Sequence, residues 1–166
     1  MHFLELFRIL SVPQDFVNER LQSVSHSFGT RTDSSGSCSW FHFLCKYIEI
    51  RQNEGDAWEV HNRRARLMLQ QSLPHADYSY HRSGFFLRFA PGDSVTLVCF
   101  GATPRVTDRL HAFINGGRWE DALAEPHVLF DIVLDGLFLE VDATVWNMNQ
   151  VFGGMEHVSQ TNKSRK

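Results

Sequence analysis

Three aspartates in the C-terminal third of the chain have the type and spacing that a hard divalent cation requires. Asp131, Asp135 and Asp142 fall on one flank of a predicted helix, two turns apart or closer. Carboxylate oxygens are the ligands that Mg²⁺ selects, often with retained water. The simpler interpretation is a solvated acidic face, or one paired with arginines between Arg63 and Arg66. We therefore expect no resident cofactor, with a weakly bound regulatory Mg²⁺ at these aspartates as the alternative.

A second cluster of potential metal ligands occurs in the middle of the chain. His75, Asp77 and His81 lie within seven residues, a set that zinc chemistry can use with one open position. A polar surface loop explains the same residues equally well. A small hydrolase would need these side chains to converge in a pocket. The chain contains no nucleophile elbow, phosphate-binding glycine loop, zinc-ligand quartet or kinase signature, so we predict that it is not an enzyme.

The aspartates lie on a predicted helix from Pro126 to Met155. An apolar seam with alternating steps of four and three residues follows this helix, which is typical of a heptad pattern. One interpretation is a long helix that packs the seam on the core of its own domain. The other is a stalk that packs it on another copy of the chain. The seam and predicted interface consist of Leu134, Phe138, Val141, Val145, Met148, Phe152 and Met155.

Charge is distributed unevenly, although the net charge is only −3. Residues 119–162 contain eight acidic residues and no Lys or Arg. Nothing in this balance suggests a nucleic-acid partner. Three cysteines without metal-type spacing indicate reduced thiols. The N-terminus does not have the pattern of a signal peptide, and no stretch approaches 18 uninterrupted apolar residues. These features predict a cytoplasmic protein, membrane-associated only if the chain is part of a longer membrane protein.

The N-terminal half predicts helices followed by strands. Residues 3–10 share a helical face, and Ser11 is expected to cap a second helix, with Gln14 closing a capping box. Phe16, Val17 and Leu21 would form the buried stripe of that helix. Residues 29–39 are rich in Gly, Ser, Thr and Asp and predict a loop. Residues 40–50 are dense in aromatic and β-branched side chains, which favours a central strand covered on both faces.

The second half returns from strands to helices. A further strand is predicted at 57–70, and residues 84–89 and 94–100 predict a hairpin. Thr103 and Pro104 begin a helix that Asn115-Gly116-Gly117 stops, and Gly153-Gly154 is expected to interrupt the long helix. The order predicts an α+β or α/β fold, a layered sheet of about four or more strands flanked by helices, with a long C-terminal stalk-like helix. We expect one domain over 1–157 and a polar, disordered tail over 158–166.

Several segments together resemble the CorA-like transporter domain family of fungal-type proteins, and the resemblance covers most of residues 1–157. The similarity lies in the order of the segments and in their residue types. It includes the opening helix with Val12-Pro13, the aromatic strand and the long helix. The matching segments are Phe3-Leu4-Glu5-Leu6-Phe7, Ser25-His26-Ser27-Phe28-Gly29, Tyr47-Ile48-Glu49, Asp56-Ala57-Trp58, Gly84-Phe85-Phe86-Leu87-Arg88-Phe89, and the helix from Glu125-Pro126-His127 to Val145-Trp146.

The resemblance implies a soluble α/β/α domain that continues through a stalk helix, as in pentameric Mg²⁺ transporters that sense divalent ions through acidic residues at subunit contacts. This chain lacks both membrane spans and the Gly-Met-Asn pore motif of that family, so we expect neither transport nor membrane insertion by this chain itself. The expected function is a non-catalytic regulatory or assembly domain, a truncated relative or a portion of a longer membrane protein, with a homo-oligomer formed through the long helix. The alternative is a protein-interaction module whose seam binds a helix of another protein.

Overall fold

The computed structural model describes residues 3–34, 36–47, 49–52, 58–61, 79–90 and 94–163, without the side chains of residues 3, 4, 49, 59–61, 79 and 154–163. The chain forms two compact units, Met1–Leu44 with Arg82–Leu139 and Cys45–His81 with Glu140–Lys166. The elements are α1 (Phe3–Ile9), α2 (Gln14–Leu21), β1 (Ser27–Asp33), β2 (Gly36–Tyr47), β3 (Glu49–Gln52), β4 (Trp58–His61), β5 (Ser79–Ala90), β6 (Ser94–Phe100), α3 (Pro104–Asn115), α4 (Trp119–Ala124) and α5 (Val128–Lys163).

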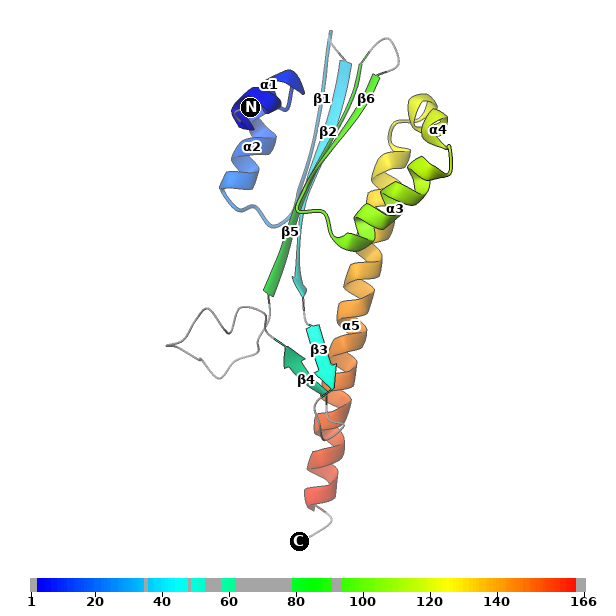
Figure 1. Ribbon diagram of the computed structural model, residues 1–166. Helices are drawn as coiled ribbons and strands as arrows, with labels where there is room; N and C mark the ends of the chain where they lie inside the picture. Colours follow the sequence, from blue (N-terminus) through cyan, green and yellow to red (C-terminus); the bar gives the residue numbers. More distant parts are fainter. Residues whose placement is uncertain are drawn as a thin grey trace. The chain divides into compact units, whose positions relative to one another are not determined.

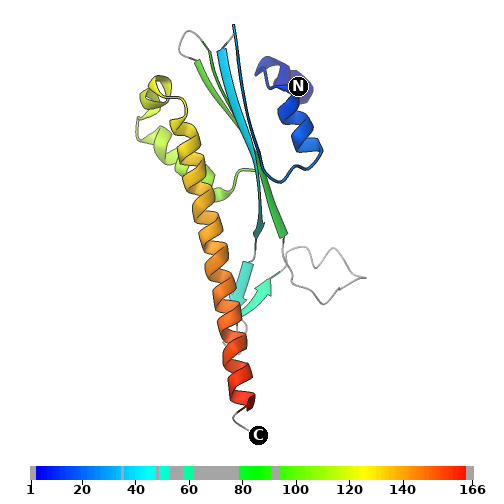
Figure 2. The same ribbon diagram turned by 180° about the vertical axis from the view of Figure 1, so that it is seen from behind.

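The first unit is built on a four-stranded antiparallel sheet with the strand order β1-β2-β5-β6. Helices α1 and α2 lie on one face of this sheet, and α3 and the beginning of α5 lie on the other (Figures 1 and 2). The predicted hairpin is confirmed, with Gly84 opposite Phe100 and Ala90 opposite Ser94. The predicted layered sheet with flanking helices and a long C-terminal helix is confirmed as an α+β fold.

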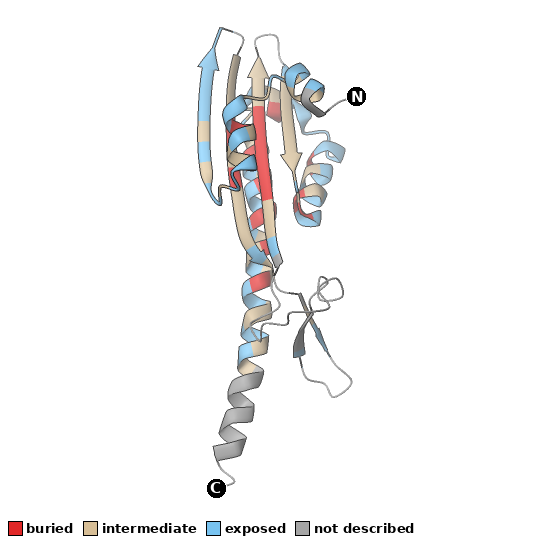
Figure 3. Cartoon of the chain, turned by 90° about the vertical axis from the view of Figure 1, so that its left-hand side faces the viewer, coloured by how far each residue is buried: buried red, intermediate tan, exposed pale blue. Residues whose placement is uncertain are grey.

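Each face of the sheet has its own hydrophobic core, and β5 contributes to both. Phe85 and Leu87 pack with residues of α3 and α5, whereas Phe86 packs with Phe16 of α2 and Trp40 of β2. Because successive side chains of a strand point to opposite faces, a strand covered on both faces needs a continuous apolar run. Figure 3 shows the buried stretch along the middle of this strand. The central position predicted for the strand of residues 40–50 is confirmed for Trp40–Tyr47, which belong to β2 between β1 and β5, whereas Ile50 belongs to β3.

The start of α3 follows the sequence prediction closely. Thr103 is the N-cap, and its Oγ1 accepts a hydrogen bond from the Val106 N–H at 3.2 Å. Pro104 occupies the first turn, where its missing N–H costs nothing. The helix ends at Asn115 with Gly116 as the C-cap, as predicted. This local chemistry places buried Val106 against the beginning of α5.

The predicted loop at residues 29–39 is wrong, because most of these residues form the hairpin of β1 and β2. The polar side chains of residues 30–33 lie on β1, the outer strand of the sheet, where backbone hydrogen bonds maintain pairing without burial. Gly29 lies opposite Trp40, and a Cβ at Gly29 would come within 2.3 Å of the indole ring. The glycine is therefore required by a large side chain on the neighbouring strand rather than by a turn.

The capping box predicted at Ser11 is also wrong. The N-cap of α2 is Pro13, and no side chain caps the helix. Ser11 lies between α1 and α2 with a φ of 53°, a left-handed conformation that ends the first helix. Of the predicted stripe, Phe16 is buried and Val17 is half-buried, but Leu21 is exposed.

In the second unit, β3 and β4 form a separate two-stranded antiparallel sheet, with Glu49 opposite His61 and Gln52 opposite Trp58. The strand predicted at 57–70 is thus present over Trp58–His61, and its remainder lies outside the described residues.

Helix α5 continues to Lys163, so Gly153-Gly154 does not interrupt it and residues 158–163 are helical rather than a tail. A glycine lowers helix stability but does not remove a backbone hydrogen-bond donor, and no proline follows it. Among the described residues, no helix is both long enough and apolar enough to cross a membrane.

Candidate functional site

One stripe of α5 supplies the core of the first unit. Phe130, Val133 and Leu137 are buried with the apolar side chains of β5 and α3. Gly136 lies in the same contact, and a Cβ at this position would be 2.7 Å from the Cα of Val106. The stripe follows steps of three and four residues, so it marks a single face of the helix. This face needs no further partner.

The predicted seam lies on a different face of α5 and is exposed to solvent. The side chains of Leu134, Phe138, Val145 and Phe152 are between 43% and 67% exposed, and Trp146 beside them is also exposed. Val141 and Met148 are half-buried, whereas the side chain of Met155 lies outside the described residues. The interpretation in which the seam packs on its own domain is therefore wrong for these exposed residues. Its assignment as an interface stays a prediction.

The seam and the buried stripe are displaced by one residue. Buried Val133 and Leu137 each precede an exposed seam residue, and one residue corresponds to about 100° of rotation around a helix. The sequence pattern does not distinguish the two faces, since both are apolar at the same spacing over residues 130–138. Helix α5 thus has one apolar face that is covered and another that is not. Exposed apolar faces of this kind commonly mark interaction surfaces.

Two of the three predicted metal ligands lie at one groove between α3 and α5. Asp131 and Asp135 line a cavity of about 390 Å³ together with Arg109 and Arg118. The Nε of Arg109 is 2.8 Å from Oδ2 of Asp135, and both side chains are about half exposed. An exposed pair of this type contributes at most about 1 kcal/mol to stability. The carboxylate of Asp135 therefore already has a cationic partner.

The third predicted ligand, Asp142, is exposed in the second unit. Across the described part of the chain, no three His, Cys, Asp or Glu side chains come together in a way that could hold a metal ion. The arginines at 63–66, proposed as partners of the acidic face, lie outside the described residues, as do His75 and Asp77. The weakly bound Mg²⁺ stays a prediction.

The three cysteines are free. Burial raises the pKa of the Cys99 thiol to about 11 and also raises that of Cys45. A thiol is nucleophilic only as the thiolate, so both side chains are protonated at neutral pH and suit a packing role. Burial is likewise the main reason for the raised pKa of Cys38.

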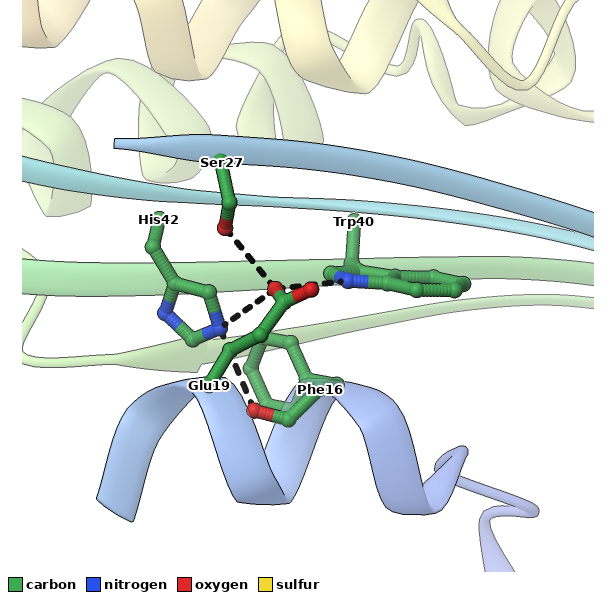
Figure 4. A network of polar contacts seen from close by, with 5 residues as sticks. All are labelled: Phe16, Glu19, Ser27, Trp40 and His42. Carbon is green, nitrogen blue, oxygen red and sulfur yellow. Dashed lines mark hydrogen bonds and ion pairs between the residues drawn. The ribbon is translucent and has the colours of Figure 1, made fainter. Parts of the chain in front are cut away.

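A polar network that the sequence does not suggest lies between α2 and the sheet (Figure 4). Oε2 of Glu19 accepts hydrogen bonds from Ser27 Oγ at 2.8 Å and from Trp40 Nε1 at 3.1 Å. His42 is buried, its ring stacks on Phe16 at 4.7 Å, and its Nε2 is 3.6 Å from the same carboxylate oxygen. These contacts join α2, β1 and β2. No motif links residues so far apart in the chain, so only the strand register could have revealed them.

The hydrogen bond of His42 fixes the position of its proton. Its Nε2 is 3.1 Å from the backbone carbonyl oxygen of Phe16, and a carbonyl can only accept, so Nε2 is the protonated nitrogen. The buried Nδ1 has no hydrogen-bond partner among the described residues. Burial lowers the pKa of His42, with Arg20 acting in the same direction, although the Phe16 carbonyl and Glu19 partly oppose this. The folded protein therefore holds this imidazole neutral.

We expect the stability of the protein to decrease on acidification because of His42. In the unfolded chain the imidazole has an ordinary pKa of about 6.5. Between that value and the lowered pKa of the folded state, only the unfolded chain binds the proton. The free energy of unfolding therefore decreases as the pH is lowered. The contribution is complete above about pH 6.5 and is lost below it. Urea unfolding at several pH values between 7.5 and 5.5 measures this slope.

The control is His42→Gln, which retains an N–H group for the Phe16 carbonyl but does not titrate. Other histidines and acids titrate equally in both proteins, so the difference in slope isolates His42. The wild type should lose more unfolding free energy than the variant over this range. Equal slopes would contradict the neutral, buried state of His42.

The geometry thus offers an exposed apolar face on α5, a partly neutralised acidic groove beside it and a buried polar network under α2. Searches of family models, of curated proteins and of solved structures give no match to this chain.

Proposed function

We propose that this chain is a non-catalytic assembly domain that associates with further copies of itself through the seam of α5. The single observation that carries the proposal is the exposure of the seam, while the neighbouring stripe of the same helix is buried. Fully burying a Leu or Phe side chain contributes about 1.5–3 kcal/mol, so several exposed seam residues are a strong driving force for association. A heptad spacing fits a second helix with the same spacing.

The resemblance to the cytosolic part of CorA-type divalent-cation transporters belongs to this proposal. The sheet covered by helices on both faces and the 36-residue α5 support it, since that domain also combines layers with a stalk helix. In this reading Asp131, Asp135 and Asp142 would make assembly sensitive to Mg²⁺. The seam is the part of the proposal with the most direct structural support.

The test replaces two seam residues of the first unit by charges. We expect the wild type to have a molar mass above the 19.1 kDa of one chain in light scattering coupled to size exclusion. The double variant Leu134→Glu/Phe138→Glu should weaken association by about 100-fold or more, because two apolar contacts are lost and two charges are introduced. Its mass should fall to that of a single chain.

Ile114→Glu is the matched control, since Ile114 is an exposed apolar residue on α3 and is not part of the seam. It should leave the mass unchanged. A wild type that stays at 19.1 kDa at all concentrations would contradict self-association and favour the interaction module that binds another protein's helix. Repeating the measurement with millimolar Mg²⁺ tests the ion: a mass that responds to Mg²⁺, and no longer does so in Asp135→Ala/Asp142→Ala, supports the transporter-like regulation.

A further inference from the structure

An apolar cavity of about 260 Å³ lies between α1, α2 and β6 in the first unit. Aromatic rings form much of its wall, with the Phe100 ring centroid 5.4 Å from that of Phe7 and 5.6 Å from that of Phe16. A cavity of about 150 Å³ is large enough for benzene, so this one has room for a longer hydrocarbon. The lining residues are Phe7, Phe16, Val17, Arg20, Leu21 and Phe100.

Arg20 is the charged residue in this lining, and a second arginine faces the same side of the sheet. A Cβ on Gly84 would point at the His42 ring and at Phe16, which shows that Gly84 faces α2. Alternate residues of a strand share a face, so Arg82 also faces α2. Burial lowers the pKa of Arg20, and the positive charge of Arg82 lowers it further. The charge of Arg82 thus acts on Arg20 from the same face of the sheet.

Neither arginine has an acidic partner within ion-pair distance in the described part of the chain. The nearest carboxylate in sequence, that of Glu19, accepts hydrogen bonds from Ser27 and Trp40 instead. Both arginines are half-buried, and removing a charge from water is costly unless a counter-charge compensates. An anion that bridges the two groups would relieve this cost.

We propose that this cavity binds a free fatty acid, with the alkyl chain among the phenylalanine rings and the carboxylate on Arg20 and Arg82. The lining provides no polar side chain other than Arg20, which disfavours sugars and nucleotides. The volume suits one short alkyl chain rather than the two chains of a membrane lipid. Guanidinium groups bind a carboxylate through two parallel hydrogen bonds, which are stronger than neutral ones.

Calorimetric titration of the full chain with octanoate tests the site. We expect saturable binding of one octanoate per chain, and each added methylene should tighten binding by up to about fourfold until the cavity is filled. Arg20→Gln should weaken octanoate binding by about 10- to 100-fold, the range for a hydrogen bond to a charged group. Octanol has the same chain without the charge, so its affinity should be the same in the wild type and in Arg20→Gln.

Two further variants locate the site. Arg109→Gln removes an arginine of α3, on the other face of the sheet, and should bind octanoate as the wild type does. Val17→Phe fills the cavity and should abolish binding of octanoate and octanol alike. If circular dichroism shows that Val17→Phe does not fold, Arg82→Gln takes its place and should weaken octanoate but not octanol. The proposal would be overturned if octanoate binding does not saturate. It would also be overturned if octanoate binds to Arg20→Gln and Arg82→Gln as tightly as to the wild type.

Discussion

Leu137→Ala is expected to lower the free energy of unfolding by about 2–5 kcal/mol, the range for deleting a buried leucine side chain. Leu137 is only 2% exposed and contacts the apolar residues of β5 and α3. Alanine would leave a cavity between α5 and the sheet that the close-packed neighbours cannot fill. Urea denaturation followed by circular dichroism gives the free-energy difference from the wild type.

The adjacent residue supplies a matched control. Phe138 is 67% exposed, and its replacement by alanine should change the stability of the single chain by no more than about 0.5 kcal/mol. The pair therefore distinguishes the two apolar faces of α5. A larger loss from Phe138→Ala than from Leu137→Ala would mean that the seam, not the stripe, packs on the sheet. Measuring at low protein concentration separates this effect from any loss of association.

Gly136→Ala should also destabilise the protein, by about 1–3 kcal/mol, although alanine is the best helix former. The added Cβ would lie 2.7 Å from the Cα and 3.0 Å from the backbone nitrogen of Val106. Backbone atoms cannot move aside as the end of a flexible side chain can. The first turn of α3 would have to shift away from α5, which weakens the core around Val106. The melting temperature should fall by about 2–4 °C for each kcal/mol.

Gly153→Ala is the control in the same helix. Among the described residues, no atom beyond the chain neighbours and the nearby backbone of the same helix lies within 4 Å of a Cβ built on Gly153, so the substitution adds helix propensity without a clash. We expect stabilisation of up to about 1 kcal/mol. If both alanines stabilise the protein, the close approach of α5 to Val106 is not a constraint on the fold. A loss of stability from Gly136→Ala together with a gain from Gly153→Ala supports this constraint.

The elements with strong local signals could be predicted from the sequence. The cap formed by Thr103, the stop at Gly116 and the hairpin ending at Phe100 depend on neighbouring residues alone. The strand β1 could not be predicted, because its polar residues are stabilised by pairing with β2 and not by their own burial. The prediction of an N-cap at Ser11 was wrong although the local sequence is suitable. Ser11 has suitable chemistry, but the turn from α1 requires a left-handed backbone there.

For the seam of α5, only the heptad spacing of its residues could be predicted from the sequence. A heptad pattern shows that Leu134 and Phe138 share a face, but not which face the sheet covers, since the stripe one residue earlier is equally apolar. Tertiary packing of Val106 against Gly136 makes that choice. The acidic flank was visible as charge, whereas the pairing of Asp135 with Arg109 depends on how α3 and α5 cross. Contacts of this kind have no signature in local sequence.

The contacts of Trp40 give the protein an internal fluorescent reporter. Its indole is 5% exposed, lies over Gly29 and donates to Glu19, whereas the other three tryptophans, Trp58, Trp119 and Trp146, are 44%, 54% and 61% exposed. Because indole emission shifts to longer wavelength in water, Trp40 should supply the short-wavelength component of the spectrum of the single chain. Loss of that component therefore signals the departure of α2 from the sheet, and its time course would follow this single event without any added label.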